Sequence, residues 1–221
     1  MNSHFLHTVT FKSNQLHKPK TMNPMFYFLT LTAVLAATAN AGGPVLDSKG
    51  HFIFSGSYYV IRRIFGAAGG GLTLVPRVEV GHYKCPLYVG HETLEVKMGI
   101  PVKFSNWMSR VGFVPESENL NIMMDAKATT CAQSNYWWVA PSNKDRKTWF
   151  IAAGPKPKTK EDSSLTSFQI KKTGDSLKGY KIVYCPKGKD CINVGIVKDK
   201  NGVRRLVLSS KPFPVVFVKA T

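Results

Sequence analysis

Two groups of side chains in this sequence have types and spacings that could serve catalysis or metal binding. His82, Cys85 and His91 have the spacing of a metal site, and Glu116 and Glu118 alternate, which on a strand would place both carboxylates on one face. Glycosidases use such a carboxylate pair. However, cysteines of secreted proteins pair as disulfides, and two carboxylates without a sugar cleft more often form a solvated edge. We therefore expect neither a metal ion nor a catalytic pair.

The motifs of common enzyme classes are also missing from the sequence. It contains no G-x-S-x-G segment, no H-E-x-x-H segment and no Gly-rich phosphate loop. We therefore expect a protein that is not an enzyme and that needs no cofactor.

The elements that must hold any site are short strands. No helical period follows residue 42; β-branched and aromatic runs recur instead, separated by Gly, Pro, Asn and Asp. Asn201-Gly202 predicts a hairpin turn, and Ala67 to Gly71 and Gly154 to Ser164 are predicted as loops. The fold class is thus all-β with about a dozen strands, predicted at Tyr58 to Ile64, Leu72 to Val75, Leu87 to Val89, Val102 to Phe104, Val111 to Val114, Leu120 to Met124, Tyr136 to Val139, Trp149 to Ala152, Phe168 to Lys171, Tyr180 to Tyr184, Val194 to Val197, Val203 to Leu208 and Val215 to Val218.

The N-terminal part has the pattern of a secretory signal. An apolar run from Met25 to Ala37 is followed by Ala39-Asn40-Ala41, a cleavage site of the A-x-A type. We expect residues 1–41 to be an N-terminal extension and signal peptide, cleaved after Ala41, and residues 42–221 to form one domain. The run is short for a bilayer span and lacks a charged stop-transfer flank, so no membrane association is expected after cleavage.

Cysteine count and charge limit the function further. The four cysteines allow three pairings, of which the close pair Cys185 and Cys191 favours a small clip that leaves Cys85 with Cys131. The formal net charge is +17, and the lysines and arginines are spread along the chain rather than massed in one block. This distribution is typical of a soluble, self-repelling surface, so we expect no nucleic-acid partner.

One segment carries a family signature. Val45-Leu46-Asp47, Gly50-His51, Ile53 and Tyr59-Val60-Ile61 have the residue types and spacing of the N-terminal signature of plant Kunitz-type inhibitors. The chain resembles this soybean trypsin inhibitor family, and it departs from the signature at Lys49. The resemblance continues in Gly69-Gly70-Gly71-Leu72-Thr73, Cys85-Pro86, Leu120-Asn121-Ile122, Trp149-Phe150, Tyr180 to Pro186, Gly195-Ile196 and Arg204 to Ser209. The Gly-rich run and the Leu-Asn-Ile segment are most similar to the miraculin-like branch.

The resemblance implies a fold, a partner and a location. Family members are β-trefoils of twelve strands with pseudo-threefold symmetry, and the family's two disulfides correspond to Cys85 with Cys131 and Cys185 with Cys191. They block serine proteases with one exposed loop and are not themselves enzymes. We therefore expect a secreted plant protein, extracellular or carried to the vacuole or cell wall. It should be a monomer whose partner is the active site of a trypsin-like serine protease.

The resemblance also implies where the inhibitory loop lies. Alignment of Gly99-Ile100 upstream and Leu120-Asn121-Ile122 downstream leaves residues 106–113 between them. Arg110 then occupies the P1 position, the residue that enters the protease specificity pocket, and Val111 occupies P1′. A guanidinium there can reach the carboxylate at the base of a trypsin-like pocket. The predicted inhibitory loop comprises Met108, Ser109, Arg110, Val111 and Gly112.

Two departures from the family pattern leave alternatives open. The loop holds one additional residue, so the register could slip to make Ser109 or Met108 the P1 residue. Met108 would suit a chymotrypsin-like or subtilisin-like protease. The family braces its loop with an Asn, and the matching position here is Ser55, which is shorter and has a single donor. Gly112 adds flexibility beside the proposed bond.

Two other functions use the same scaffold. Sugar binding is one, because lectins also form β-trefoils, but the repeated Gln-x-Trp element of ricin-type lectins is missing. The other is a miraculin-like binding or storage protein that has kept the fold and lost inhibition.

Overall fold

The computed structural model describes residues 25, 42–64, 67–68, 70–79, 82–109, 111–127, 131, 135–141, 148–154, 165–174, 179–186 and 189–221. The chain divides into two units, Met1–Asn40 and Ala41–Thr221. The first unit is described only at Met25, so the fold given below is that of the second. Among the described residues, no helix is long and apolar enough to cross a membrane.

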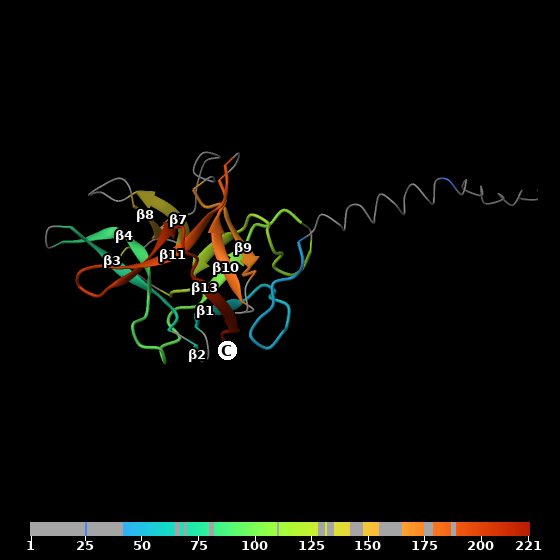
Figure 1. Ribbon diagram of the computed structural model, residues 1–221, viewed down its shortest axis with the longest axis horizontal. Helices are drawn as coiled ribbons and strands as arrows, with labels where there is room; N and C mark the ends of the chain where they lie inside the picture. Colours follow the sequence, from blue (N-terminus) through green and yellow to red (C-terminus); the bar gives the residue numbers. More distant parts are fainter. Residues whose placement is uncertain are drawn as a thin grey trace, which may run out of the picture. The chain divides into compact units, whose positions relative to one another are not determined.

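The second unit is built from antiparallel strands (Figure 1). The described part of the chain holds thirteen: β1 (Ser57–Ile64), β2 (Ala67–Ala68), β3 (Leu72–Glu79), β4 (His82–His91), β5 (Val102–Ser105), β6 (Asn121–Met124), β7 (Tyr136–Pro141), β8 (Trp149–Gly154), β9 (Phe168–Lys172), β10 (Tyr180–Tyr184), β11 (Ile192–Lys198), β12 (Arg204–Ser209) and β13 (Pro214–Lys219).

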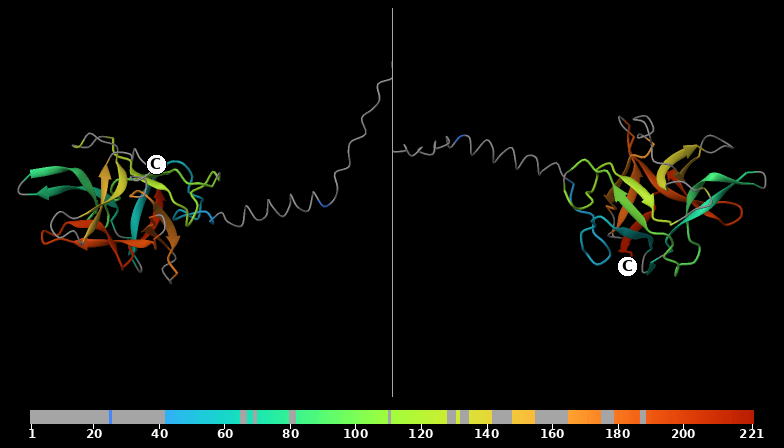
Figure 2. Two further views of the ribbon diagram at one scale, coloured as in Figure 1. Left: turned by 90° about the horizontal axis from the view of Figure 1, so that it is seen from above. Right: turned by 180° about the vertical axis from the view of Figure 1, so that it is seen from behind.

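The strand pairings close on themselves. Neighbours follow the order β11-β10-β13-β1-β5-β6-β7-β8-β12-β4-β3, and the additional pairing of β11 with β12 completes the ring. The first and last long strands meet, with Tyr58 opposite Lys219 and Arg62 opposite Val215. The β3-β4 and β11-β12 hairpins project from the same side of the ring in all three views (Figures 1 and 2). Closure leaves few free strand edges, which protects such a sheet from edge-to-edge association.

Alternating side chains fill the interior of the ring. Buried and half-buried residues alternate along β5 and β6, as expected for strands with one face turned to a core. The largest fully buried side chains include Trp137, Phe168 and Phe217. Trp137 meets Phe168 edge to face, with 5.8 Å between ring centroids. Each such side chain contributes roughly 2 to 3 kcal/mol by leaving water.

The second unit contains two disulfides, one between residues far apart in the sequence and one across a short turn. Cys85 in β4 pairs with Cys131, and Cys185 pairs with Cys191 across the turn between β10 and β11. These are the pairs that the resemblance implied.

The hairpin predicted at Asn201-Gly202 joins β11 to β12, but only Gly202 has a positive φ, of 81°. The Asp199 side chain accepts hydrogen bonds from the backbone N of Asn201 and of Val203, and these shape the turn.

Two strand predictions were wrong. Val111 to Val114 is not a strand, because its backbone bonds to the N-terminal segment at a single position, Val114, instead of along a ladder. Ala67–Ala68, predicted as loop, forms the two-residue strand β2 on β1. Apart from Gly154, the predicted loop from Gly154 to Ser164 lies outside the described residues.

Candidate functional site

The segment predicted to be inhibitory leaves and re-enters the sheet at one end of a strand pair. Val102 of β5 lies opposite Met124 of β6, and Ser105 lies opposite Asn121, so residues 106–120 form one long loop. The loop turns where Asn106 and Ser117 have φ values of 66° and 60°. Positive φ is uncommon for residues other than Gly, and here it turns the chain near the beginning and near the end of the loop.

A tryptophan clasps the outer part of this loop. The indole Nε1 of Trp107 donates a hydrogen bond of 3.0 Å to the backbone O of Val111. Trp107 is half-buried and packs against the hydrophobic core, so the donor is carried by a fixed ring. The bond spans the three residues between them and ties the loop across its outer turn.

A carboxylate holds the same loop from its other side. The backbone N of Ser109 donates a 2.9 Å hydrogen bond to Oε2 of Glu118. Met108 is 88% exposed between these two contacts, and Gly112 is exposed after them. Arg110 lies outside the described residues, so the contacts on either side of it define the site. Met108, Ser109, Val111 and Gly112 therefore belong to one anchored loop, in which Met108 and Gly112 are exposed.

The returning arm of the loop is tied to the N-terminal segment. The backbone N of Val114 donates to O of Ile53 at 2.8 Å, and the N of Val45 donates to O of Val114 at 2.9 Å. The rings of Phe52 and Phe113 also meet edge to face, with centroids 5.7 Å apart. The segment that carries the family signature thus supports the loop directly.

Asp47 of the signature organises this N-terminal segment. Its Oδ1 accepts hydrogen bonds from the backbone N of Lys49, at 2.8 Å, and of His51, at 2.9 Å. Burial alone would raise the pKa of Asp47, but the hydrogen bonds from His51 and Lys49 lower it. Because Lys49 contributes its backbone N to the turn, the departure from the family pattern at this position does not remove the contact.

Ser55, predicted as the loop brace, is exposed. No hydrogen bond joins it to a described residue of the loop. Its role as a brace stays a prediction. The contacts that hold the described parts of the loop come from the side chains of Trp107, Glu118 and Phe52 and from the backbone of Val45 and Ile53.

The carboxylates predicted to share one strand face were placed wrongly. Glu116 and Glu118 lie in the loop rather than on a strand, and they have different partners. Nζ of Lys172 lies 2.8 Å from Oε1 of Glu116, and the hydrogen bond that the lysine donates to this carboxylate raises the pKa of Lys172. Glu118 anchors Ser109. Neither carboxylate forms the solvated edge that the sequence indicated.

The metal site weighed for His82, Cys85 and His91 is not formed by the described residues. Cys85 is in a disulfide with Cys131, and the side chain of His82 lies outside the description. No group of three or more potential metal ligands occurs among the described residues.

Sequence reasoning missed the two residues that hold the loop. From the sequence, Trp107 had no predicted role of its own in the loop, and Glu118 was expected at a solvated edge. The spacing of Trp107 and Val111 offers a weak signal, because an indole can reach a backbone group that is only four residues away. The Glu118 contact depends on the return path of the chain, which no local pattern encodes.

Comparison with known proteins identifies the family of this chain. Residues 45–219 match the Kunitz (legume) family described as trypsin and protease inhibitor. Kunitz trypsin inhibitor 4 of Arabidopsis thaliana is 52% identical over 208 residues, covering 91% of this chain and 93% of that protein. The alpha-amylase/subtilisin inhibitor of Oryza sativa subsp. japonica is 35% identical, covering 87% and 92%.

A solved structure of porcine pancreatic trypsin with soybean trypsin inhibitor contains a chain that is 28% identical. The TM-score is 0.64, with 81% of this chain and 100% of that chain covered. The relatives are inhibitors rather than enzymes. The chain belongs to the Kunitz family of trypsin and protease inhibitors.

Proposed function

We propose that this protein inhibits trypsin-like serine proteases by presenting loop 106–113 as a substrate, with Arg110 as P1 and Val111 as P1′. The observation that carries the proposal is the pair of anchors on either side of position 110. Ser109 is tied through its backbone N to Glu118, and Val111 through its O to Trp107. A loop fixed in this way loses little entropy when it docks, so more of the contact energy becomes affinity.

The same anchors explain how the loop resists digestion. If a protease cleaves the bond between Arg110 and Val111, the new amino end remains tied by Trp107 and the new acyl end by Glu118. Both ends then stay close to each other, and the bond can re-form before either end leaves. Arg110 supplies specificity, since its guanidinium can pair with the carboxylate in a trypsin-like pocket.

A second target class is favoured by one specific observation. Met108 is 88% exposed in the same loop, and a long apolar side chain suits the pocket of a subtilisin-like or chymotrypsin-like protease. The rice relative named as an alpha-amylase/subtilisin inhibitor shows that the scaffold serves this class elsewhere. A slip of one or two residues in the loop register would exchange Arg110 for Ser109 or Met108 at P1.

The experiment is a titration of trypsin with the purified protein, beside Arg110→Ala and the matched control Arg63→Ala at an exposed position of β1. We expect tight inhibition that Arg110→Ala weakens by about 100-fold or more, as for a central interface residue, and that Arg63→Ala leaves unchanged. Inhibition of subtilisin or chymotrypsin that is lost in Met108→Ala would instead assign P1 to Met108. No inhibition by the unaltered protein would indicate a binding or storage role.

The fold and the processing of the chain complete the proposal. We infer a β-trefoil, supported by the closed antiparallel ring and by the likeness to the soybean inhibitor chain. Superposition of the three thirds of an experimental structure tests the threefold symmetry. We further propose a secreted monomer that begins at Gly42, which two disulfides suit. N-terminal sequencing and size-exclusion chromatography of the secreted protein test both points.

A further inference from the structure

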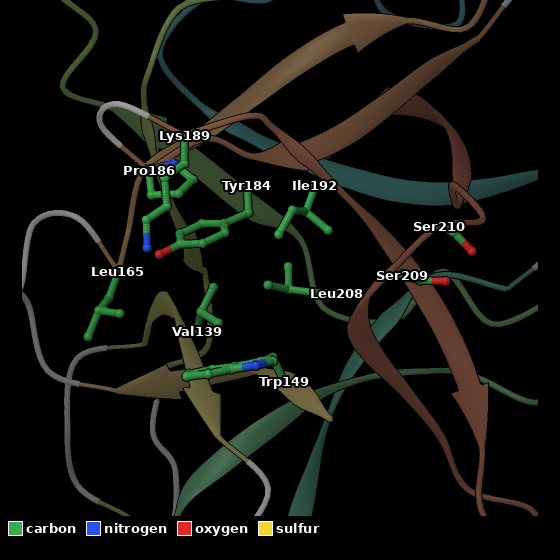
Figure 3. Close-up of a pocket in the computed structure, with 10 residues that line it drawn as sticks. All are labelled: Val139, Trp149, Leu165, Tyr184, Pro186, Lys189, Ile192, Leu208, Ser209 and Ser210. Atoms are coloured by element: carbon green, nitrogen blue, oxygen red, sulfur yellow. The ribbon is translucent and has the colours of Figure 1, made fainter. Parts of the chain in front are cut away.

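A cavity of about 630 Å³ has a lining that contains no described residue of the inhibitory loop. Figure 3 shows ten of the residues that line it. Its described lining comes from β7, β8, β10, β11, β12 and adjoining residues, and none of it belongs to β5, β6 or residues 106–120. The volume is within the range of small-molecule sites, which are typically about 300 to 1,000 Å³.

Aromatic rings lie on opposite sides of this cavity. Figure 3 shows the indole of Trp149 edge-on along one side, the ring of Tyr184 along the other, and Val139 and Leu208 between them. Trp149 is 40% exposed and Ile192 is 43% exposed, which is unusual for such large apolar side chains. Because both line the same hollow, the exposed apolar surface is gathered in a concave site. A planar ring system bound in this site could contact Trp149 on one side and Tyr184 on the other.

One cation lies at the rim of the cavity. Lys189 is the only charged residue in the described lining. Its backbone N donates to O of Pro186 at 3.2 Å, within the turn that the disulfide between Cys185 and Cys191 closes. In Figure 3 the amino group of Lys189 and the hydroxyl of Tyr184 point toward the same side. Burial raises the pKa of Tyr184, so this hydroxyl remains a neutral donor.

We propose that this cavity binds a small planar aromatic acid, whose ring lies between Trp149 and Tyr184 and whose carboxylate or sulfonate pairs with Lys189. Apolar contact with both rings supplies most of the affinity, and the lysine selects acids over neutral molecules. The site shares no described residue with the inhibitory loop, so ligand binding and protease inhibition are separate activities.

The test uses a matched pair of fluorescent probes. Anilinonaphthalene sulfonate carries its acid on a planar naphthalene ring system, and N-phenylnaphthylamine has the same rings without the acid. We expect both probes to bind the folded protein, with the anion binding more tightly. Lys189→Gln should weaken binding of the anionic probe by about twofold to fivefold, the range of an exposed ion pair. It should leave binding of the neutral probe unchanged. Lys200→Gln, at an exposed lysine outside the lining, is the matched control and should change neither.

Substitutions in the wall test the ring contacts. Trp149→Ala and Ile192→Ser, which alter different strands, should each weaken both probes, Trp149→Ala by about tenfold. Near-ultraviolet circular dichroism shows whether each variant keeps its native packing. The proposal is overturned if neither probe binds the native protein, or if binding survives both substitutions. It is equally overturned if the signal is lost in Val96→Ser, which removes an 87% exposed side chain elsewhere.

A final experiment tests whether ligand binding and protease inhibition are independent. Trypsin should be inhibited with the same affinity when the anionic probe saturates the protein. If the protein inhibits no protease, the probe titrations still decide whether the cavity binds aromatic acids. Competition between the probe and trypsin would contradict the separation of the sites.

Discussion

The indole Nε1 of Trp107 lies 3.0 Å from the backbone O of Val111, and this hydrogen bond spans the bond between Arg110 and Val111 that we propose as the reactive bond. Trp107 itself packs on the hydrophobic core. The hydrogen bond from Trp107 therefore ties the loop to a side chain that packs on the core. Without this hydrogen bond, the contacts that remain on the described part of the loop come from Glu118 and from the N-terminal segment.

Removal of the Trp107 hydrogen bond should turn a stable inhibitor into a slowly digested one. Trp107→Phe keeps a packed ring and loses the donor to Val111, so we expect the inhibition constant for trypsin to rise about tenfold, close to one hydrogen bond. Cleavage between residues 110 and 111 should also become detectable by mass spectrometry over hours. Trp138→Phe is the matched control, because Trp138 Nε1 is buried with no partner among the described residues. Equal effects of both substitutions would contradict the clasp.

The Glu118 anchor requires an acceptor rather than a charge. Glu118→Gln keeps an oxygen that can accept from the N of Ser109, whereas Glu118→Ala removes it. We therefore expect Glu118→Ala to weaken trypsin inhibition by about fivefold to tenfold and Glu118→Gln to weaken it by less than about twofold. Glu95→Ala, at an exposed glutamate, serves as the control. A loss in Glu118→Gln as large as that in Glu118→Ala would show that the negative charge acts on the protease instead.

The local sequence pattern predicted most of the strands, because a strand with one buried face has an apolar residue at every second position. Twelve of the thirteen strands in the described residues overlap a predicted run. The failure at Val111 to Val114 has a physical reason: β-branched and aromatic residues also line a loop that packs on a neighbouring segment, here through Phe113 on Phe52. The prediction of a loop at Ala67–Ala68 was wrong for the opposite reason, because two small residues are too few to show the alternation of a strand.

The site was predictable only in part, since its parts depend on different levels of structure. The signature around Asp47 encodes a local turn, so sequence alone could identify it. Met108 and its neighbours could be placed by their distance from recognisable flanking segments. The anchors at Trp107 and Glu118 could not, because each joins positions whose proximity follows from the path of the whole loop.

The two disulfides should stabilise the fold unequally. Cys85 and Cys131 are 46 residues apart, and Cys185 and Cys191 are six apart. In the chain-entropy account, removing the first should cost about 4 kcal/mol of unfolding free energy and the second about 2 kcal/mol. Urea unfolding of the two double Cys→Ala variants measures this. A larger loss for the pair Cys185 and Cys191 would mean that the clip acts through native contacts, such as those around Lys189, rather than through the unfolded chain.

The buried His91 should make the protein lose stability in mild acid. His91 is 3% exposed, and its Nδ1 lies 3.5 Å from the guanidinium of Arg204. Burial, and then the positive charges of Arg204 and Arg62, lower the pKa of His91 from 6.5 to about 4. Between pH 6.5 and about pH 4, this histidine is protonated in the unfolded chain and neutral in the folded chain. The free energy of unfolding must therefore fall as the pH drops from about 6.5 to about 4, by up to about 3 kcal/mol, and this group causes no further loss below about pH 4.

Urea unfolding at closely spaced pH values between 7 and 3 checks this expectation. His91→Gln should flatten the curve between pH 6.5 and 4 whatever it does to absolute stability, because the slope reports only proton uptake. His51→Gln, at an exposed histidine, should leave the slope in place. The carboxylates of Asp47 and Asp199, whose pKa values are lowered, act in a separate window: their stabilisation is present at higher pH and is lost below about pH 4. A slope between pH 6.5 and 4 that persists in His91→Gln would assign the acid sensitivity to another group.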